Sequence, residues 1–269
     1  MSSSVESDTA RSPSSGLVVR RHADFVVEIE LDRPQALNAV STELAREIVS
    51  TLRTISADDE TRALVLSSSK ARAFCVGADL KERSQFSDDD LLSQRSVIRE
   101  LFASVRELPM PAIAAVQGFA LGGGFELALS CDVIIADSTA VFGLTEVTVG
   151  LVPGGGGTQL LPRRVGAGAA AHLMLSGRKV NADEAFRLGI ADQLVPEGQA
   201  LAAARDLASA IAANSPIAVR AAKRAGRAAY GAGSFDVEDA SWHTAAVSAD
   251  RREGIAAFAE KRKPNWSGR

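Results

Sequence analysis

Two glutamates and a run of glycines are the residues whose types and spacing indicate chemistry. Glu126 follows the three glycines at positions 122–124 and is otherwise surrounded by apolar residues, and Glu146 has a similar setting in the segment FGLTEV. An unpaired carboxylate buried among apolar side chains is costly. Each glutamate therefore needs either a structural partner or a catalytic role, and the residues taken singly are compatible with both.

The glycines at 122–124 are expected to open a helix after a strand that ends near Gln117. Backbone N–H groups at a helix start have no partner within the helix and, with the helix dipole, favour an anion. This arrangement is half of an oxyanion hole, although a tight strand-to-helix connection would also require glycine. A second turn, residues 74–81 (FCVGADLK), could present further N–H groups after a strand-like run.

The elements that must position these residues alternate along the chain. Short β-branched runs are separated by longer amphipathic segments, a pattern typical of layered α/β structure. The strands are expected at residues 17–19, 25–31, 63–67, 112–116, 133–136 and 140–142. The helices between them are expected at residues 41–55, 88–108 and 122–131.

The chain from about residue 166 onward is predicted to be an Ala-rich helical layer. Its helices are expected at residues 167–175, 182–188, 199–213, 216–230 and 235–260. Their narrow polar faces indicate burial on more than one side, which favours an oligomer. The Ser-rich residues 1–15 are predicted to be a disordered tail, residues 16–200 the core, and residues 201–269 a C-terminal helical region.

Composition and motifs argue against several other classes of function. A net charge of −3 produces no positive electrostatic field that would attract the phosphate backbone of a nucleic acid. The sequence therefore does not favour nucleic acid as the main partner. No apolar run is long enough for a membrane span, and residues 1–16 resemble neither a secretory signal nor a presequence, so a cytoplasmic protein is expected. The two cysteines have no framework spacing and are interpreted as buried thiols.

Metal and nucleotide motifs are missing as well. The three histidines are scattered and lie in no HExxH, and there is no GxSxG elbow or P-loop. The GxGxxA match at residues 166–171 lacks a preceding buried strand. One basic helix face is either solvated or a phosphate-binding surface, and its members are Arg220, Lys223, Arg224 and Arg227.

Several motifs in order resemble the enoyl-CoA hydratase/isomerase (crotonase) superfamily over residues 17–266. They are LDRP with LNA at 31–39, FCVGADL at 74–80, the segment 118–126, GLTE at 143–146 and PGGGGTQ at 153–159. The resemblance implies an α/β fold in which ββα units coil into a spiral, followed by a helical region that builds trimers, commonly paired into hexamers. It also implies an enoyl-CoA thioester substrate and neither a metal nor a redox cofactor.

The resemblance further implies roles for individual residues. The thioester oxygen would be held by the N–H groups of Ala78 and Gly123, and Glu126 and Glu146 would hold the water that is added to the double bond. The substrate and its CoA moiety would lie along Ala36, Asp79, Leu80, Lys81 and Gly122. Two close carboxylates should titrate as a pair in which at least one pKa is raised.

Some alternatives stay open. The presence of both glutamates favours a hydratase over a Δ3,Δ2-enoyl-CoA isomerase, which needs only one. Thr145, Phe125 and Val76 depart from residues frequent in the family, and these departures concern the acyl pocket more than the chemistry. The segment 143–158 also resembles methylglutaconyl-CoA hydratases. An acyl-CoA-binding or RNA-binding protein without turnover is the alternative from another class.

Overall fold

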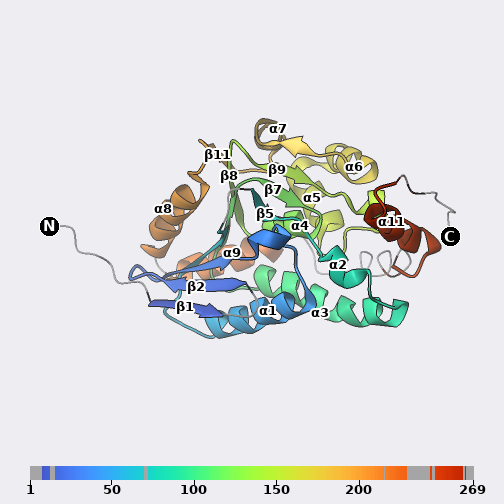
Figure 1. The fold of residues 1–269 in the computed structure, drawn as a ribbon. Coiled ribbons are helices and arrows are strands. Elements are labelled where there is room, and N and C mark those ends of the chain that lie inside the picture. The colour runs from blue at the N-terminus through green and yellow to red at the C-terminus, as the bar shows by residue number, and fades with distance from the viewer. Residues whose placement is uncertain are drawn as a thin grey trace.

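The structure is a computed structural model that describes residues 8–12, 16–69, 72–214, 216–228, 243, 246–262 and 264 (Figure 1). Its frame is two β-sheets. The larger sheet has seven strands in the order β1-β2-β3-β4-β6-β8-β11 and the smaller has four in the order β10-β9-β7-β5. The strands of the larger sheet are β1 (Asp8–Ser12), β2 (Leu17–Arg21), β3 (Val26–Leu31), β4 (Ala63–Ser68), β6 (Ala112–Val116), β8 (Val133–Asp137) and β11 (Gln193–Val195). Those of the smaller sheet are β5 (Ala73–Cys75), β7 (Phe119–Leu121), β9 (Val141–Gly143) and β10 (Val180–Asn181).

Successive strand pairs feed both sheets in the same way. In each of the pairs β4–β5, β6–β7 and β8–β9 the first strand joins the larger sheet and the second joins the smaller one. Strands β3, β4, β6, β8 and β11 run parallel to one another, as do β5, β7 and β9, whereas β1, β2 and β10 pair in the antiparallel sense. This repetition is the spiral of ββα units that the family resemblance implies, and the predicted fold class is confirmed.

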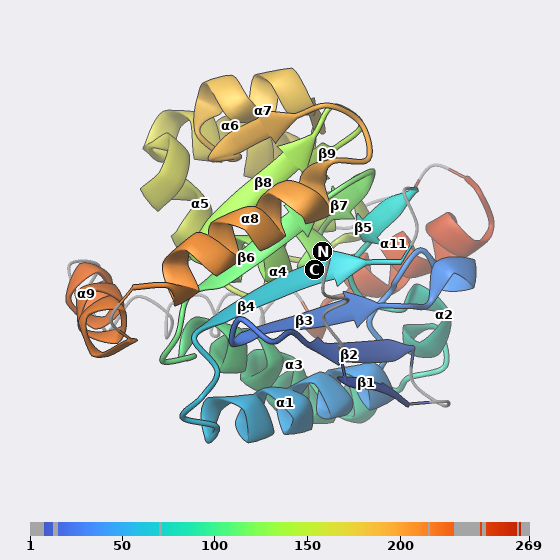
Figure 2. The ribbon, with the colours of Figure 1, turned by 90° about the vertical axis from the view of Figure 1, so that its left-hand side faces the viewer.

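Helices cover both faces of the larger sheet, as Figure 2 shows. Helices α1 (Thr42–Ser56), α3 (Asp88–Arg106) and α4 (Gly123–Ser130) pack on one face, and α8 (Ala200–Ala212) packs on the other. Because side chains alternate along a strand, Leu64 and Leu66 of β4 face the first group while Val65 faces the alanines of α8. Since α8 covers a sheet face, the core continues past residue 200.

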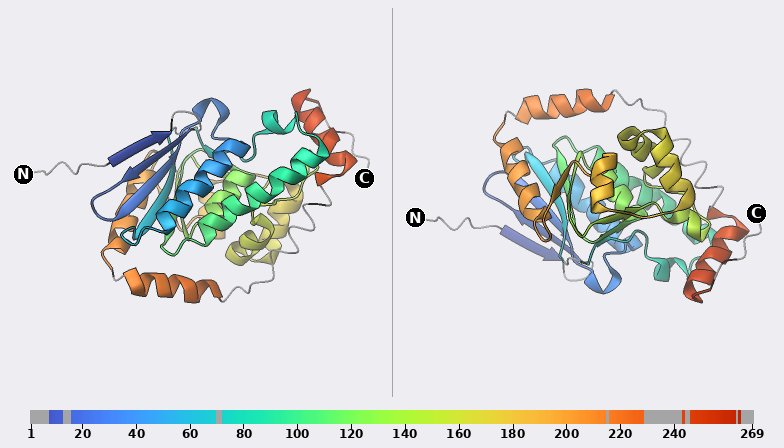
Figure 3. Two further views of the ribbon diagram at one scale, coloured as in Figure 1. Left: turned by 90° about the horizontal axis from the view of Figure 1, so that it is seen from below. Right: turned by 90° about the horizontal axis from the view of Figure 1, so that it is seen from above.

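The remaining helices lie around this frame. They are η1 (Pro34–Ala36), α2 (Leu80–Arg83), η2 (Glu146–Val149), α5 (Gly157–Val165), α6 (Ala167–Ser176), α7 (Ala182–Leu188), α9 (Pro216–Ala228) and α11 (Ala249–Ala259). Figure 3 shows α9 lying along one side of the molecule and α11 at the opposite end from β1 and β2. No helix among the described residues is both long enough and apolar enough to cross a membrane.

Several elements differ from the sequence prediction. Residues 8–12, within the segment predicted to be a disordered tail, form β1 against β2. Backbone hydrogen bonds to an open sheet edge make this strand, so a Ser-rich composition does not reveal it. Strands β10 and β11 lie in the region predicted to be helical, and at two and three residues they are too short to show a period. The helix predicted at 235–260 lies partly outside the described residues, and α11 begins only after its cap, Ser248.

Candidate active site

The three parallel strands of the smaller sheet bring the predicted site residues together. Strands β9, β7 and β5 are neighbours, and their carboxyl ends lead into Glu146, the glycines at 122–124 and Ala78 respectively. In parallel sheets, binding and catalytic groups gather at this end because the loops that follow all the strands leave on the same side. Ala78, Gly123 and Glu146 are distant in sequence and meet because each lies in the turn after one strand of the same sheet.

Backbone amides of Ala78 and Gly123 lie close together at this edge. A Cβ placed on Gly123 would lie 3.8 Å from the Ala78 nitrogen and 3.5 Å from Gly77 Cα. Within the described part of the chain, neither N–H group donates to another backbone carbonyl. Two adjacent donors at the start of α4 and just before α2 form a site suited to a developing oxyanion.

Glycine is required where α4 starts. Gly122 precedes the helix with φ 53° and ψ −127°, a conformation that L side chains rarely adopt. A Cβ on Gly124 would lie 1.9 Å from the carbonyl oxygen of Cys75. The glycines therefore allow the start of α4 to touch the end of β5, which is what sets the two amides side by side.

Glu126 is fixed by the loop that precedes α5. Its Oε1 accepts hydrogen bonds from the N–H groups of Gly155 and Gly157 at 2.7 and 2.9 Å, and the residue is only 3% exposed. Burial raises the pKa of Glu126, while those two amides and the charges of Arg95 and Arg106 oppose the rise. The direction agrees with the expectation that one glutamate of the pair has a raised pKa.

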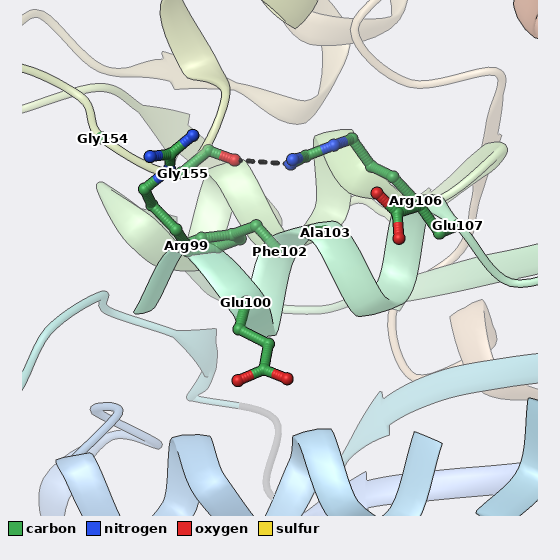
Figure 4. Close-up of a pocket in the computed structure, with 8 residues that line it drawn as sticks. All are labelled: Arg99, Glu100, Phe102, Ala103, Arg106, Glu107, Gly154 and Gly155. Carbon is green, nitrogen blue, oxygen red and sulfur yellow. Dashed lines mark hydrogen bonds between the residues drawn. The ribbon is translucent and has the colours of Figure 1, made fainter. Parts of the chain in front are cut away.

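Two arginines of α3 hold the carbonyl groups of the same loop. Arg95, which is buried, donates from Nη1 to the Gly154 oxygen at 2.6 Å. Arg106 donates from Nη1 to the Gly155 oxygen at 2.9 Å (Figure 4). Arg106 and Phe102 border a cavity of about 310 Å³ between α3 and residues 154–155. Figure 4 shows the residues that line it.

The sequence did not reveal that these arginines contact the candidate site. On a helix surface, polar residues at such spacings predict a solvated face. Only the position of the loop against α3 shows that they contact the backbone that binds Glu126.

Glu146 begins η2, the single turn after β9. Its Oε1 would lie 3.1 Å from a Cβ placed on Gly122, so the carboxylate lies against the start of α4. Helix α11 packs against this turn. A Cβ placed on Gly254 of α11 would lie 2.3 Å from the Val149 oxygen of η2. Glu146 and Glu126 thus enter the same site from the ends of neighbouring strands.

A third charged group, Arg83 of α2, is also buried beside this site, with 8% of the residue exposed. Its Nε donates to Oε1 of Gln94 at 2.9 Å. Burial lowers the pKa of Arg83 to about 10, while the negative charges of Glu82, Glu146 and Glu126 oppose that change. The sequence analysis did not single out this residue.

The residues predicted to bind the substrate and CoA gather around Ala78, and their roles stay predictions. Ala36 lies in η1, and the segment after η1 is bonded to the turn through Val40, whose N–H donates to Gly77 and whose oxygen accepts from Asp79. The Asp79 carboxylate caps α2 and contacts Arg33 at 3.2 Å. The other three predicted residues border the same turn: Leu80, Lys81 and Gly122.

Three of the four cations predicted on the basic face of α9 contact the rest of the chain, and the fourth, Arg224, is exposed. Lys223 contacts Asp132 at 2.8 Å and donates to the Met110 oxygen, and Arg227 contacts Asp132 at 2.8 Å. Arg220 donates to the Thr61 oxygen at 3.2 Å. These three cations attach α9 to the end of the larger sheet, so they do not form a fully solvated face.

The cysteines agree with their interpretation as buried thiols, since both are free and buried. Burial raises the pKa of Cys75 and of Cys131 to about 12. Within the described ranges, no cluster of three or more His, Cys, Asp or Glu side chains could hold a metal ion.

The fold and the arrangement of this site place the chain in a known class: it belongs to the enoyl-CoA hydratase/isomerase family, whose model matches residues 21–269. The chain is 42% identical to the putative enoyl-CoA hydratase/isomerase YngF of Bacillus subtilis over 243 residues, 89% of this chain and 94% of that protein. It is 41% identical to the mouse enoyl-CoA hydratase domain-containing protein 2, mitochondrial, over 91% of this chain and 85% of that protein.

Solved structures of similar proteins have the same fold. The crystal structure of an enoyl-CoA hydratase from Bacillus anthracis is 39% identical, with a TM-score of 0.78 over 94% of this chain and all of that chain. A carnitinyl-CoA hydratase from Mycobacterium avium is 36% identical, with a TM-score of 0.84 over 95% of this chain and 99% of that chain.

Proposed function

We propose that this protein is an enoyl-CoA hydratase, which adds water across the α,β double bond of an enoyl-CoA thioester to give a 3-hydroxyacyl-CoA. The observation that carries the proposal is the convergence of Glu126 and Glu146 on the two adjacent amides of Ala78 and Gly123. Hydration needs an acid, a base and a place for negative charge, and these four groups supply all three.

Negative charge develops on the thioester oxygen as water attacks Cβ. The N–H groups of Ala78 and Gly123 would stabilise that enolate, and one such donor is typically worth about 3 to 4 kcal/mol. Because they are backbone groups held by α4 and the β5–α2 turn, they need no reorganisation during the reaction.

The two glutamates would share the proton transfers. Glu126 would activate the water that attacks Cβ, and Glu146 would deliver a proton to Cα. The loop amides that donate to Oε1 of Glu126 leave its Oε2 to interact with the water. A positioned acid or base typically contributes about 10²- to 10⁴-fold. Side chains and backbone donors carry every step, so we propose no metal and no redox cofactor.

The substrate would be held as a CoA thioester beside η1 and α2. This part of the proposal extends the activity in the names of the relatives to the chain, with Ala36, Asp79, Leu80 and Lys81 along the CoA moiety. We further propose that the protein works as a homotrimer or a dimer of trimers.

The test is the loss of enoyl-thioester absorbance with crotonyl-CoA, with the product identified by mass. The parent should form the hydroxyacyl thioester, and Glu126→Gln and Glu146→Gln should each lower kcat by about 10²- to 10⁴-fold. The matched control is Glu43→Gln, which removes an exposed carboxylate of α1 and should leave the rate unchanged.

The relatives whose names include isomerase define the contrary outcome. If the parent moves the double bond of a 3-enoyl-CoA and forms no hydroxyacyl product from any enoyl-CoA, the protein is an isomerase. Tight binding of acyl-CoA without any product would instead indicate a binding protein.

A further inference from the structure

Asn38 is a buried residue in the segment that follows η1, and its side chain contacts the strand that leads into the candidate site. Only 1% of the residue is exposed. Its Nδ2 donates to the Ala73 oxygen at 3.2 Å and to the Phe74 oxygen at 3.0 Å, both in β5. Its Oδ1 accepts from the Arg33 N–H at 2.8 Å. The carboxamide therefore has partners for its donor group and for its acceptor inside the protein.

The backbone of Asn38 has a conformation that few residue types adopt. Its φ is 56°, and Leu37 before it has a φ of 51°. Asparagine tolerates this left-handed region better than most residues because its short polar side chain can form local hydrogen bonds. These two residues turn the chain at the end of η1, so that the segment after them lies beside the turn that follows β5.

The segment after Asn38 pairs with that turn in the parallel sense. The Val40 N–H donates to the Gly77 oxygen at 2.7 Å, and the Asp79 N–H donates to the Val40 oxygen at 3.0 Å. Val40 is thereby the bridge partner of Ala78. The residue whose N–H we assign to the oxyanion hole thus lies in a backbone pairing that begins two residues after Asn38.

This pairing fixes the direction of the Ala78 N–H. A trans peptide unit is planar, and its C=O and N–H groups point to opposite sides. Because the Gly77 carbonyl points toward Val40, the N–H of the same peptide unit, which belongs to Ala78, points away from Val40. Accepting the bond from Val40 also polarises this peptide unit, which strengthens its N–H as a donor. The position of Val40 therefore controls both the direction and the strength of one oxyanion donor.

We propose that Asn38 is a positioning residue for the oxyanion hole. Its hydrogen bonds hold the segment beside β5, and the segment orients the Ala78 N–H through Val40. The inference rests on the proposed role of the Ala78 amide in the hydratase, but its effect on a bound thioester can be measured without turnover. Loss of the Asn38 side chain should weaken the hydrogen bond to the thioester oxygen.

Two simpler roles for Asn38 have different signatures. If Asn38 only stabilises the fold, its loss lowers the free energy of unfolding and leaves a bound thioester carbonyl unchanged. If it only supports the predicted CoA contact at Ala36, two residues earlier, its loss weakens binding and again leaves the carbonyl unchanged. The state of the bound carbonyl therefore distinguishes the proposal from both.

The first test is infrared spectroscopy of bound butyryl-CoA labelled with carbon-13 at the thioester carbonyl. This saturated thioester cannot be hydrated, and its carbonyl stretch moves to lower frequency when the oxygen accepts hydrogen bonds. Binding to the parent should lower the frequency, and Asn38→Gly should lose about half or more of that shift, since one of two donors is misdirected. Glycine adopts a positive φ readily, so this variant removes the hydrogen bonds without forbidding the backbone conformation. A full shift in Asn38→Gly overturns the proposal.

Asn181→Gly is the matched control. Asn181 is exposed and caps α7, where its Oδ1 accepts from the Glu184 N–H at 2.9 Å. The change removes the same side chain and a comparable hydrogen bond at a position away from β5. The carbonyl shift and the kinetic constants should stay those of the parent, and an equal loss in this variant would contradict the proposal.

A backbone substitution tests the same connection if Asn38→Gly does not fold. Replacing Val40 by the corresponding α-hydroxy acid turns its amide into an ester, which deletes the N–H that donates to Gly77 and keeps the side chain. This variant should also lose about half or more of the carbonyl shift, because the peptide unit that contains the Ala78 N–H loses the bond that orients it. A full shift here overturns the proposal as well.

Kinetics separates the proposal from the hydratase function. With crotonyl-CoA, Asn38→Gly should lower kcat about 10- to 10²-fold with little change in KM, the cost of a misplaced group in the site. A higher KM with an unchanged kcat would mean that Asn38 supports only CoA binding, which contradicts the proposal. A parent that shifts the carbonyl but hydrates no enoyl-CoA would refute the hydratase function, and loss of that shift in Asn38→Gly would still support the role of Asn38.

Discussion

At the scale of single residues, Glu126 combines burial with two backbone donors on one oxygen. Its pKa is raised in the folded protein, so ionisation disfavours the folded state. The contribution of this carboxyl to stability is complete below its usual pKa of 4.5 and is lost as the pH rises through the higher folded value. This sign leads to a prediction about stability.

We expect Glu126→Gln to gain stability relative to the parent as the pH is raised from 4 to 8. The amide keeps an oxygen that can accept from Gly155 and Gly157 but carries no charge to bury. Melting temperatures of both proteins across that range provide the measurement, and the gap should widen by a few degrees. If this difference in melting temperature became smaller as the pH rises, the hydrogen-bond donors would stabilise the ionised Glu126 carboxylate more than burial destabilises it, and the prediction would be wrong.

Gly124 is the residue that lets α4 approach β5. We expect Gly124→Ala to lower the free energy of unfolding by about 3 kcal/mol or more, because the nearest atom to the new Cβ is the Cys75 backbone oxygen, which cannot rotate away. Chemical denaturation measures the loss. The control is Gly168→Ala in α6, where a Cβ meets nothing within 4 Å, and similar losses in both variants would contradict the packing argument.

At the scale of elements, helix α3 positions the loop at 154–157. Arg95 and Arg106 hold its carbonyl groups while its amides hold Glu126, so the loop is fixed from both sides. Both arginine charges also oppose the rise in the Glu126 pKa. These arginines can therefore influence both the placement and the ionisation of Glu126.

We expect Arg106→Met to lower kcat about tenfold or more with little change in KM, since small misplacements of a catalytic group cost up to about 10²-fold. The acid limb of the kcat profile should move to higher pH, because the pKa of Glu126 rises further without the nearby cation. Steady-state kinetics from pH 5 to 9 tests both effects. Arg106→Lys keeps the positive charge, so its pH profile should stay close to that of the parent. A lower kcat in Arg106→Met with an unchanged pH profile would show that Arg106 contributes only to packing.

At the scale of the whole molecule, apolar side chains remain outside the core that one chain builds. Leu175 of α6 is 78% exposed and Ile217 of α9 is 80% exposed. Meanwhile α9 is attached to the larger sheet mainly by the ion pairs of Lys223 and Arg227 with Asp132. A second subunit against these helices would bury the exposed apolar surface.

We expect light scattering to give a mass of three or six chains of 28.1 kDa. Ile217→Asp should shift the protein toward smaller species, because a carboxylate would be buried at the contact. Phe25→Asp, at a partly exposed site after β2, is the control and should leave the mass unchanged. A parent of one chain, or an unchanged mass in Ile217→Asp, would remove α9 from the interface.

Much of the architecture was accessible from the sequence because it follows from local pattern. The periodicity of residues 41–55 and 88–108 predicted α1 and α3, and the apolar runs predicted the longer strands of the larger sheet. The glycines at 122–124 and the isolated Glu126 indicated a site because both residue types are costly without a function. The short strands β10 and β11 were not predicted, since pairing rather than pattern creates them.

The sequence by itself thus determined the types of element, the family and the two glutamates, all of which depend on neighbours in the chain. Only the tertiary structure decided which distant groups meet. The amides that hold Glu126 lie 29 and 31 residues away, and Arg95 lies 59 residues from the carbonyl that it holds. The positions of Arg83, Arg95 and Arg106 beside the site, and the attachment of the α9 cations to Asp132, depend on contacts made when the sheets coil, and these contacts leave no period in the sequence.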